Sequence, residues 1–195
     1  MPNSINLFAA SKIKYAIHSD SMQLNMVTKF PYEPGVQLAV STSKPLKAKI
    51  RIRIPSWAAK EMTVFVNGKK AMTGKPGNYV TLSQEWKNGD IISFDLPMSF
   101  KATRYEGAEE KYNDGQHYAL EYGPLLMAAF KLKDPKTEIK INSKSEKLIK
   151  NIKAVPGKLL HFTINGNEDI QYRPYFEIQD EPFTCYPAIT GLSSN

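Results

Sequence analysis

Acidic side chains that could act as a catalytic pair lie close together in one polar stretch. Four of them surround Tyr112, namely Glu106, Glu109, Glu110 and Asp114. Hydrolysis of a glycosidic bond needs two carboxyl groups that flank the bond, but adjacent residues on a strand, such as Glu109 and Glu110, point to opposite faces. We therefore interpret the stretch as a solvated loop. Glu121 lies in an apolar segment, where a lone carboxylate more often pairs with Lys or Arg than takes part in chemistry.

Nucleophiles and metal ligands are equally sparse. Cys185 is the one cysteine, so the chain has no internal disulfide and no CxxC zinc motif, and we interpret Cys185 as a small buried apolar residue. The histidines His18, His117 and His161 are far apart in the sequence, and no GxSxG or phosphate-binding glycine motif occurs. We predict no catalytic residue, no metal site and no cofactor.

Aromatic side chains are the remaining candidates for ligand contact. A flat ring exposed beside a turn can pack against the face of a sugar, and four residues meet this description: Trp57, Trp86, Tyr105 and Tyr112. The alternative is that these rings pack in the core or at the rim of a sheet. We favour packing for the two tryptophans, because both lie within apolar patterns.

Positive charge is concentrated in one part of the chain. The formal net charge is +7, and residues 131–158 contain nine Lys and only three acidic residues. The stretch has no Arg and no aromatic residue, whereas proteins that read nucleic acids usually combine Lys with both. We interpret Lys131–Lys158 as a solvated face or charged strand edges, and we expect no nucleic-acid partner.

Period-2 alternation of apolar and polar residues dominates the sequence. Residues 47–54 read Lys-Ala-Lys-Ile-Arg-Ile-Arg-Ile, a pattern that gives a strand one solvent-exposed face and one buried face. Asn67-Gly68, between the apolar residues of 63–66 and Lys69, predicts a tight hairpin turn in which both central residues have positive φ. Further strands are expected at 79–82 and 91–96.

Other short strands are expected throughout the chain. They cover 13–17, 23–30, 36–40, 118–122, 125–130, 139–141, 148–152, 160–164 and 172–178. The best helical candidate is 145–153. Many short strands with turns between them predict an all-β, antiparallel β-sandwich that is jelly-roll-like. We expect the sandwich in residues 1–130 and, in 131–195, a smaller β lobe that either stands alone or completes the same sandwich.

Neither a transmembrane segment nor a secretory signal is visible in the chain. No apolar run reaches the roughly 18 residues that a membrane-spanning helix needs, and the first residues lack the basic and apolar regions of a signal peptide. We expect no membrane partner, and a parent protein could be periplasmic or secreted.

Several motifs, in order, carry a resemblance to a known family. They are Arg51-Ile52-Arg53-Ile54-Pro55-Ser56-Trp57-Ala58, Val66-Asn67-Gly68-Lys69, Gly77-Asn78-Tyr79-Val80-Thr81-Leu82, Glu85-Trp86-Lys87-Asn88-Gly89-Asp90, Leu96-Pro97-Met98 and Ala119-Leu120-Glu121-Tyr122-Gly123-Pro124-Leu125. Together they resemble the C-terminal part of glycoside hydrolase family 127, enzymes of the β-L-arabinofuranosidase type. The resemblance spans about residues 5–130, and Arg173-Pro174-Tyr175-Phe176 is similar to a family segment near the C-terminus.

The resemblance implies an accessory role. In that family, an (α/α)6 barrel N-terminal to the sandwich holds the cysteine nucleophile and the zinc-binding Cys/Glu cluster, and no position of this chain matches that motif. The implied function is a non-catalytic sandwich that packs on an upstream barrel of an enzyme acting on arabinofuranose-containing plant glycans. Such a region would carry an apolar patch that can drive self-association of the isolated chain. The alternatives are a free-standing carbohydrate-binding module and an independent hydrolase.

Overall fold

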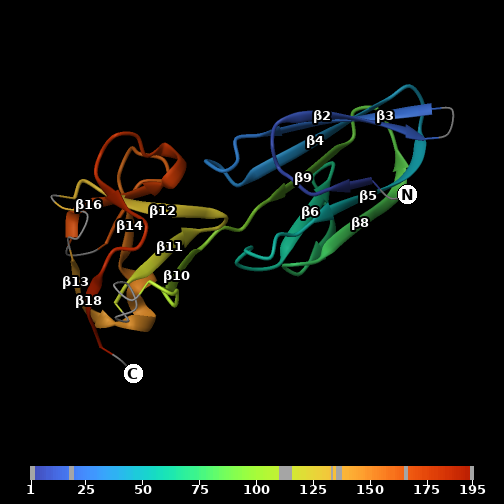
Figure 1. Cartoon of the computed structure of the whole chain (residues 1–195). Helices are drawn as coiled ribbons and strands as arrows, with labels where there is room; N and C mark the ends of the chain where they lie inside the picture. The colour runs from blue at the N-terminus through green and yellow to red at the C-terminus, as the bar shows by residue number, and fades with distance from the viewer. Residues whose placement is uncertain are drawn as a thin grey trace. The chain divides into compact units, whose positions relative to one another are not determined.

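The computed structural model describes residues 3–17, 20–109, 116–132, 134, 138–164 and 167–193. Across these ranges the chain is built from β-strands with short 3-10 helices and no α-helix (Figure 1). The prediction of an all-β, antiparallel sandwich is therefore confirmed. Within these ranges, no helix has the length and apolar character needed to cross a membrane.

Two compact units make up the chain, Met1–Met98 and Ser99–Asn195. The boundary predicted from the sequence, between residues 130 and 131, falls inside the second unit, after the strand Leu125–Phe130.

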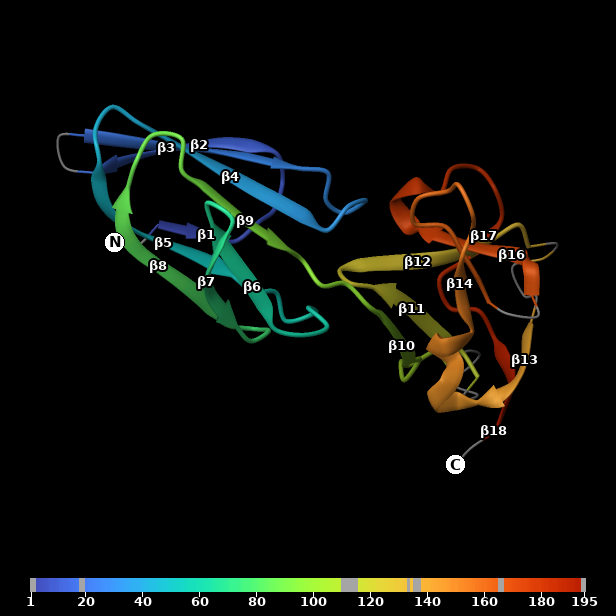
Figure 2. The ribbon, with the colours of Figure 1, turned by 180° about the vertical axis from the view of Figure 1, so that it is seen from behind.

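The first unit is a sandwich of two sheets. The six-stranded sheet has the order β2-β3-β4-β9-β6-β7, and the three-stranded sheet has the order β1-β5-β8 (Figure 2). The larger sheet contains β2 (Ser11–Ile17), β3 (Asp20–Thr28), β4 (Gly35–Thr42), β9 (Ile91–Asp95), β6 (Met62–Val66) and β7 (Lys69–Gly74). The smaller one contains β1 (Asn3–Ile5), β5 (Leu46–Arg53) and β8 (Tyr79–Trp86).

Alternation along the strands produces the core between these sheets. On β5, Ile50 and Ile52 are fully buried, and they share one cluster with Leu24 and Leu38 from the larger sheet. The cationic positions between them face solvent, as the alternating sequence predicted. Burial of these apolar faces from both sheets is the main force that holds the unit together.

Side-chain hydrogen bonds anchor the turn that joins β6 and β7. Asn67 and Gly68 have φ values of 52° and 74°, which confirms the predicted turn. The Asn67 side-chain amide donates to Asp90 Oδ1 at 2.9 Å, and Asn67 Oδ1 accepts from the Ile91 backbone N–H at 2.8 Å. The turn is thereby attached to the start of β9, the strand that separates β4 from β6.

The second unit has one large sheet and one small one. The large sheet runs β10-β11-β12-β16-β15-β14, and β17 also pairs with β12, while β13 and β18 form a parallel pair. The strands are β10 (Phe100–Arg104), β11 (Tyr118–Tyr122), β12 (Leu125–Phe130), β13 (Ile139–Lys144), β14 (Ile152–Ala154), β15 (Phe162–Ile164), β16 (Asn167–Pro174), β17 (Phe183–Thr184) and β18 (Ile189–Ser193). Two 3-10 helices complete it, η2 (Ser145–Asn151) and η3 (Tyr175–Glu177).

The lysine-rich stretch is part of this unit rather than a linker. Ile139 and Leu148 from β13 and η2 are buried in the core cluster of the unit. The lysines whose burial the structure describes are exposed: Lys131, Lys140, Lys150, Lys153 and Lys158. This arrangement agrees with the interpretation of a solvated face.

Two strand predictions were wrong in part. Residues 148–152 lie mostly in η2, so the helical alternative for 145–153 describes them better, although the helix is of the 3-10 type. The strand predicted over 172–178 ends at Pro174 and continues as η3. Proline has no N–H for the ladder, which explains why the strand stops there.

Candidate functional site

Trp86 is a core residue at the end of β8. Its side chain has no exposed surface, and its indole Nε1 donates to the Ala48 carbonyl oxygen at 3.2 Å. A ring with both faces buried and its polar atom paired leaves no surface for a sugar. The environment of Trp86 is therefore the one expected for a ring that packs in the core.

Trp57 lies half-buried after β5. Its ring stacks on Phe30, with centroids 5.9 Å apart and planes 8° apart, and it packs against the core of the first unit. One face of the indole is therefore already used within the protein. The two tryptophans are both in the first unit but do not form a common platform.

Tyr105 lies in the second unit, where its half-buried ring meets the ring of Tyr186 edge-on at 5.5 Å. Its hydroxyl oxygen accepts a hydrogen bond from the Glu109 backbone N–H at 3.4 Å. Gly107 lies against the same ring, because a Cβ placed there would overlap Tyr105.

Tyr112, the fourth aromatic candidate, lies outside the described residues, as do Glu110, Asp114 and His18.

Acidic and metal-binding groups do not converge in the described part of the chain. Glu121 on β11 is partly exposed, lies 3.7 Å from Lys101 Nζ and accepts from the Thr103 hydroxyl at 3.3 Å, so it pairs with a cation. Within the ranges that the structure describes, no three His, Cys, Asp or Glu side chains are placed to hold a metal ion.

The remaining nucleophile and histidines have ordinary structural surroundings. Cys185 is half-buried, and burial raises the pKa of its thiol, which favours the unreactive neutral form. His161 Nδ1 lies 2.9 Å from the Leu159 carbonyl oxygen, and its ring meets Phe130 edge-on. His117 forms an isolated β-bridge with Ala188.

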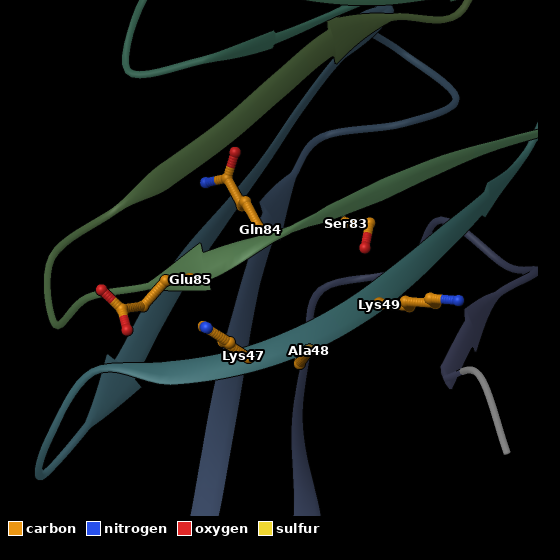
Figure 3. A pocket seen from close by; sticks show the side chains of 6 residues that line it. All are labelled: Lys47, Ala48, Lys49, Ser83, Gln84 and Glu85. Carbon is orange, nitrogen blue, oxygen red and sulfur yellow. The ribbon is translucent and has the colours of Figure 1, made fainter.

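A shallow hollow of about 420 Å³ lies across β5 and β8 in the first unit. Its lining residues are Lys47, Ala48, Lys49, Ser83, Gln84 and Glu85 (Figure 3). Strand register pairs Lys47 with Glu85 and Lys49 with Ser83 on one face of the sheet, whereas Gln84 points the other way. The hollow is thus shallow and open to solvent, and it lies between exposed side chains.

The same face of β5 continues as a cationic row. Lys47, Lys49, Arg51 and Arg53 alternate along the strand, and the Arg51 guanidinium lies 4.3 Å from the centroid of the Tyr79 ring. The Tyr79 hydroxyl donates to Asn6 Oδ1 at 2.8 Å, which holds that ring in place. This row suits generic contact with anions, but its polar groups are spread along the strand and do not converge on one point.

A second hollow, of about 300 Å³, lies on the larger sheet of the first unit. It is lined by Gly35, Val36, Gln37, Phe65, Ser93, Phe94 and Asp95. None of these residues was predicted from the sequence to be a candidate for ligand contact. Alternation alone marks Phe65 as the apolar residue on the polar face of β6, but nothing local in the sequence indicates that Gln37, Ser93 and Asp95 lie beside it.

The fold and surfaces define a two-unit all-β protein that presents shallow ligand-sized hollows. Residues 4–98 match the family model described as "Beta-L-arabinofuranosidase, GH127 middle domain". The match covers the first unit almost completely and supports a GH127-related domain there. That description refers to a middle domain, so the C-terminal placement implied by the sequence resemblance stays a prediction. No curated protein matches the sequence.

Solved structures share the fold over nearly the whole chain. A GH127 beta-L-arabinofuranosidase from Geobacillus stearothermophilus T6 matches with a TM-score of 0.69 and 17% identity, over 96% of this chain and 33% of that one. A protein described as a glycoside hydrolase matches with 0.69 and 16%, over 95% and 35%. A GH127 beta-arabinofuranosidase matches with 0.69 and 15%, over 98% and 36%. The chain therefore spans about a third of the length of these structures.

Proposed function

We propose that this chain is a non-catalytic accessory β-sandwich region of a GH127-type glycoside hydrolase acting on arabinofuranose-containing plant glycans. In this proposal it packs on an upstream (α/α)6 barrel and supports one rim of the active-site cleft. The observation that carries the proposal is the pair of coverages in the structural matches. They include at least 95% of this chain but at most 36% of each neighbouring chain.

The arrangement of side chains supports a structural rather than a chemical role. Glu121 is paired with Lys101, and burial raises the pKa of the Cys185 thiol. Apolar rings also remain exposed on the second unit, where Tyr175 and Phe176 of η3 are 51% and 56% exposed. Adjacent exposed aromatic rings are typical of surfaces that a further domain covers.

A hydrolysis assay tests the proposal that the chain is non-catalytic. The purified chain should release no aryl alcohol from an aryl β-L-arabinofuranoside, with or without zinc and reductant. Turnover that persists through a final purification step and disappears on heat denaturation would refute a non-catalytic role.

A binding experiment tests the proposal that the chain packs on an upstream barrel. The coding sequence upstream of the first codon should encode a helical barrel with cysteine and glutamate zinc ligands. When that barrel is expressed separately, it should bind this chain in size-exclusion chromatography and unfold at a higher temperature in the complex. A barrel that neither binds the chain nor gains stability from it would overturn the proposed packing.

A further inference from the structure

The hollow on the larger sheet of the first unit has a floor of main chain and a rim of side chains. Val36 and Phe94 are only 1% and 3% exposed, because their side chains point into the core, so they line the hollow with backbone atoms. Gln37 and Asp95 are exposed on the other face of the sheet, and Phe65 is 36% exposed there. The hollow thus lies on the outer face of β4, β9 and β6.

Strand register brings the rim residues into two neighbouring rows. Gln37 pairs with Ser93, and Phe65 also pairs with Ser93, so these three side chains form one row across β4, β9 and β6. Directly paired residues of antiparallel strands point to the same face. Because neighbouring strands lie about 4.8 Å apart, the α-carbons of Gln37 and Phe65 are about 10 Å apart with Ser93 between them.

The second row leaves space beside the first. Gly35 pairs with Asp95, and a Cβ added to Gly35 would be in ordinary contact with Asp95 Oδ1 at 3.6 Å. The absence of a side chain at Gly35 therefore opens the hollow in front of the Asp95 carboxylate.

The polar groups at this rim are free to bind a ligand. Among the residues that the structure describes, none forms a side-chain hydrogen bond or ion pair with Gln37, Ser93 or Asp95. On the same face of the sheet, by contrast, the hydroxyls of Thr63 and Thr73 lie 3.0 Å apart and satisfy each other. The side-chain polar groups of Gln37, Ser93 and Asp95 are thus available to a ligand.

A local irregularity of the sheet lies directly beside Phe65. The pairing of β6 with β7 shifts register between Val64 and Phe65, which leaves Ala71 without a partner. Bulges of this kind often redirect side chains near binding sites. Among the residues that the structure describes, no other aromatic ring contacts the Phe65 ring, so its exposed part is available.

These groups match one class of ligand. An amide both donates and accepts hydrogen bonds, a hydroxyl does the same, and a carboxylate accepts from adjacent hydroxyl groups. An aromatic ring provides an apolar surface for the C–H face of a sugar. Asp95 and the exposed Lys70, which pairs with Phe65, give the rim one charge of each sign, which favours a ligand without net charge. A hollow of about 300 Å³ has the size of a small-molecule site.

We propose that the outer face of β4, β9 and β6 binds a neutral monosaccharide unit of a glycan, with Phe65 packed against the sugar ring and Gln37, Ser93 and Asp95 hydrogen-bonded to its hydroxyl groups. Because the hollow is open, the bound unit can be internal to a chain or at its end. This site does not depend on the proposed packing against a barrel, so either proposal can fail while the other holds.

Titration of the ¹⁵N-labelled chain with neutral sugars tests the site. The probes are the methyl glycosides of L-arabinofuranose, D-xylopyranose, D-galactopyranose and D-glucopyranose, at concentrations up to the millimolar range. At least one of them should shift the amide signals of residues 35–37, 65 and 93–95 in a saturable way. No saturable shift with any probe, or shifts confined to other residues, would refute the proposal.

A matched pair of variants identifies the contact residues. Gln37→Ala changes an exposed residue and should weaken binding by about fivefold, the effect of one hydrogen bond, with an unchanged circular dichroism spectrum. Gln179→Ala removes the same amide from an exposed position in the second unit and should leave the affinity unchanged. Ser93→Leu fills the middle of the row and should abolish binding.

Two results would count against the site even if sugars shifted the spectrum. Equal affinities of the Gln37→Ala variant and the unsubstituted chain would show that the amide makes no contact. Line broadening at residues 35–37 and 93–95 that grows with protein concentration would show that this face binds a second copy of the chain instead.

Discussion

Replacing Trp86 with phenylalanine separates a core role for this residue from a role in ligand contact. The indole is fully buried and donates to the Ala48 carbonyl oxygen. Loss of that hydrogen bond should cost about 1 kcal/mol, and the smaller ring should cost about 2 kcal/mol through lost burial and a residual cavity. We therefore expect Trp86→Phe to lower the free energy of unfolding by about 3 kcal/mol, a large share of the 5–15 kcal/mol typical of a domain.

Trp57→Phe is the matched control. Trp57 is half-buried and stacks on Phe30, and a phenyl ring preserves most of that contact. We expect this variant to lose less than about 1 kcal/mol. Both tryptophans lie in the first unit, so each variant retains one tryptophan whose fluorescence reports the unfolding of that unit in urea.

The fluorescence of each variant provides an independent measurement. In Trp57→Phe the emission comes from Trp86 and should be blue-shifted and resistant to acrylamide, whereas in Trp86→Phe the emission comes from the more accessible Trp57. Equal stability losses in the two variants, together with ready quenching of Trp86, would show that the indole is not a core residue.

Three further predictions concern ionisation and backbone conformation. The Lys87 backbone N–H and the Asn67 side chain donate to the Asp90 carboxylate and lower its pKa from the ordinary value for Asp. Asp90→Ala should therefore cost about 1 kcal/mol at neutral pH, and urea unfolding should show this difference shrinking as the pH falls below about 4. Complete burial raises the pKa of the Tyr172 hydroxyl, so the second unit should lose stability above about pH 10, where tyrosine ionises in the unfolded chain. Tyr172→Phe should flatten that alkaline loss in circular dichroism melts, and an unchanged alkaline slope would contradict the assignment. Gly191 has a φ of 76°, and a Cβ there would collide with the Ile141 carbonyl oxygen, so Gly191→Ala should cost at least about 2 kcal/mol. Gly157→Ala, with a φ of 72° and open space around it, should cost about 1 kcal/mol in the same melts.

Local sequence signals were sufficient where the structure depends on neighbouring residues. The alternation in residues 47–54 predicted both the strand β5 and the face that it buries, because one apolar face per strand is the requirement of a sandwich. Asn67-Gly68 predicted its turn, because few other dipeptides tolerate positive φ at both positions. Residues 148–152 have a pattern too short to distinguish a strand from one helical turn, and there the strand prediction was wrong.

The division into units depends on contacts that composition does not reveal. The lysine-rich stretch suggested a boundary near residue 130, because it is the one marked change in composition. In the structure, however, β12 pairs with β16 and β17, strands from the far end of the chain. Those pairings are non-local, and no charge pattern within residues 131–158 encodes them.

Ligand-binding surfaces on a sheet are the least predictable feature, for a related reason. The large aromatic residues that stand out in the sequence are also those that a core uses most readily, and Trp86 is fully buried. Phe65 is less conspicuous, and its neighbours Gln37 and Ser93 are separated from it by 28 residues in each direction. Only the insertion of β9 between β4 and β6 brings the three together. A sheet can therefore assemble a polar site from residues that carry no local motif, because register places every second residue of each strand on a common face.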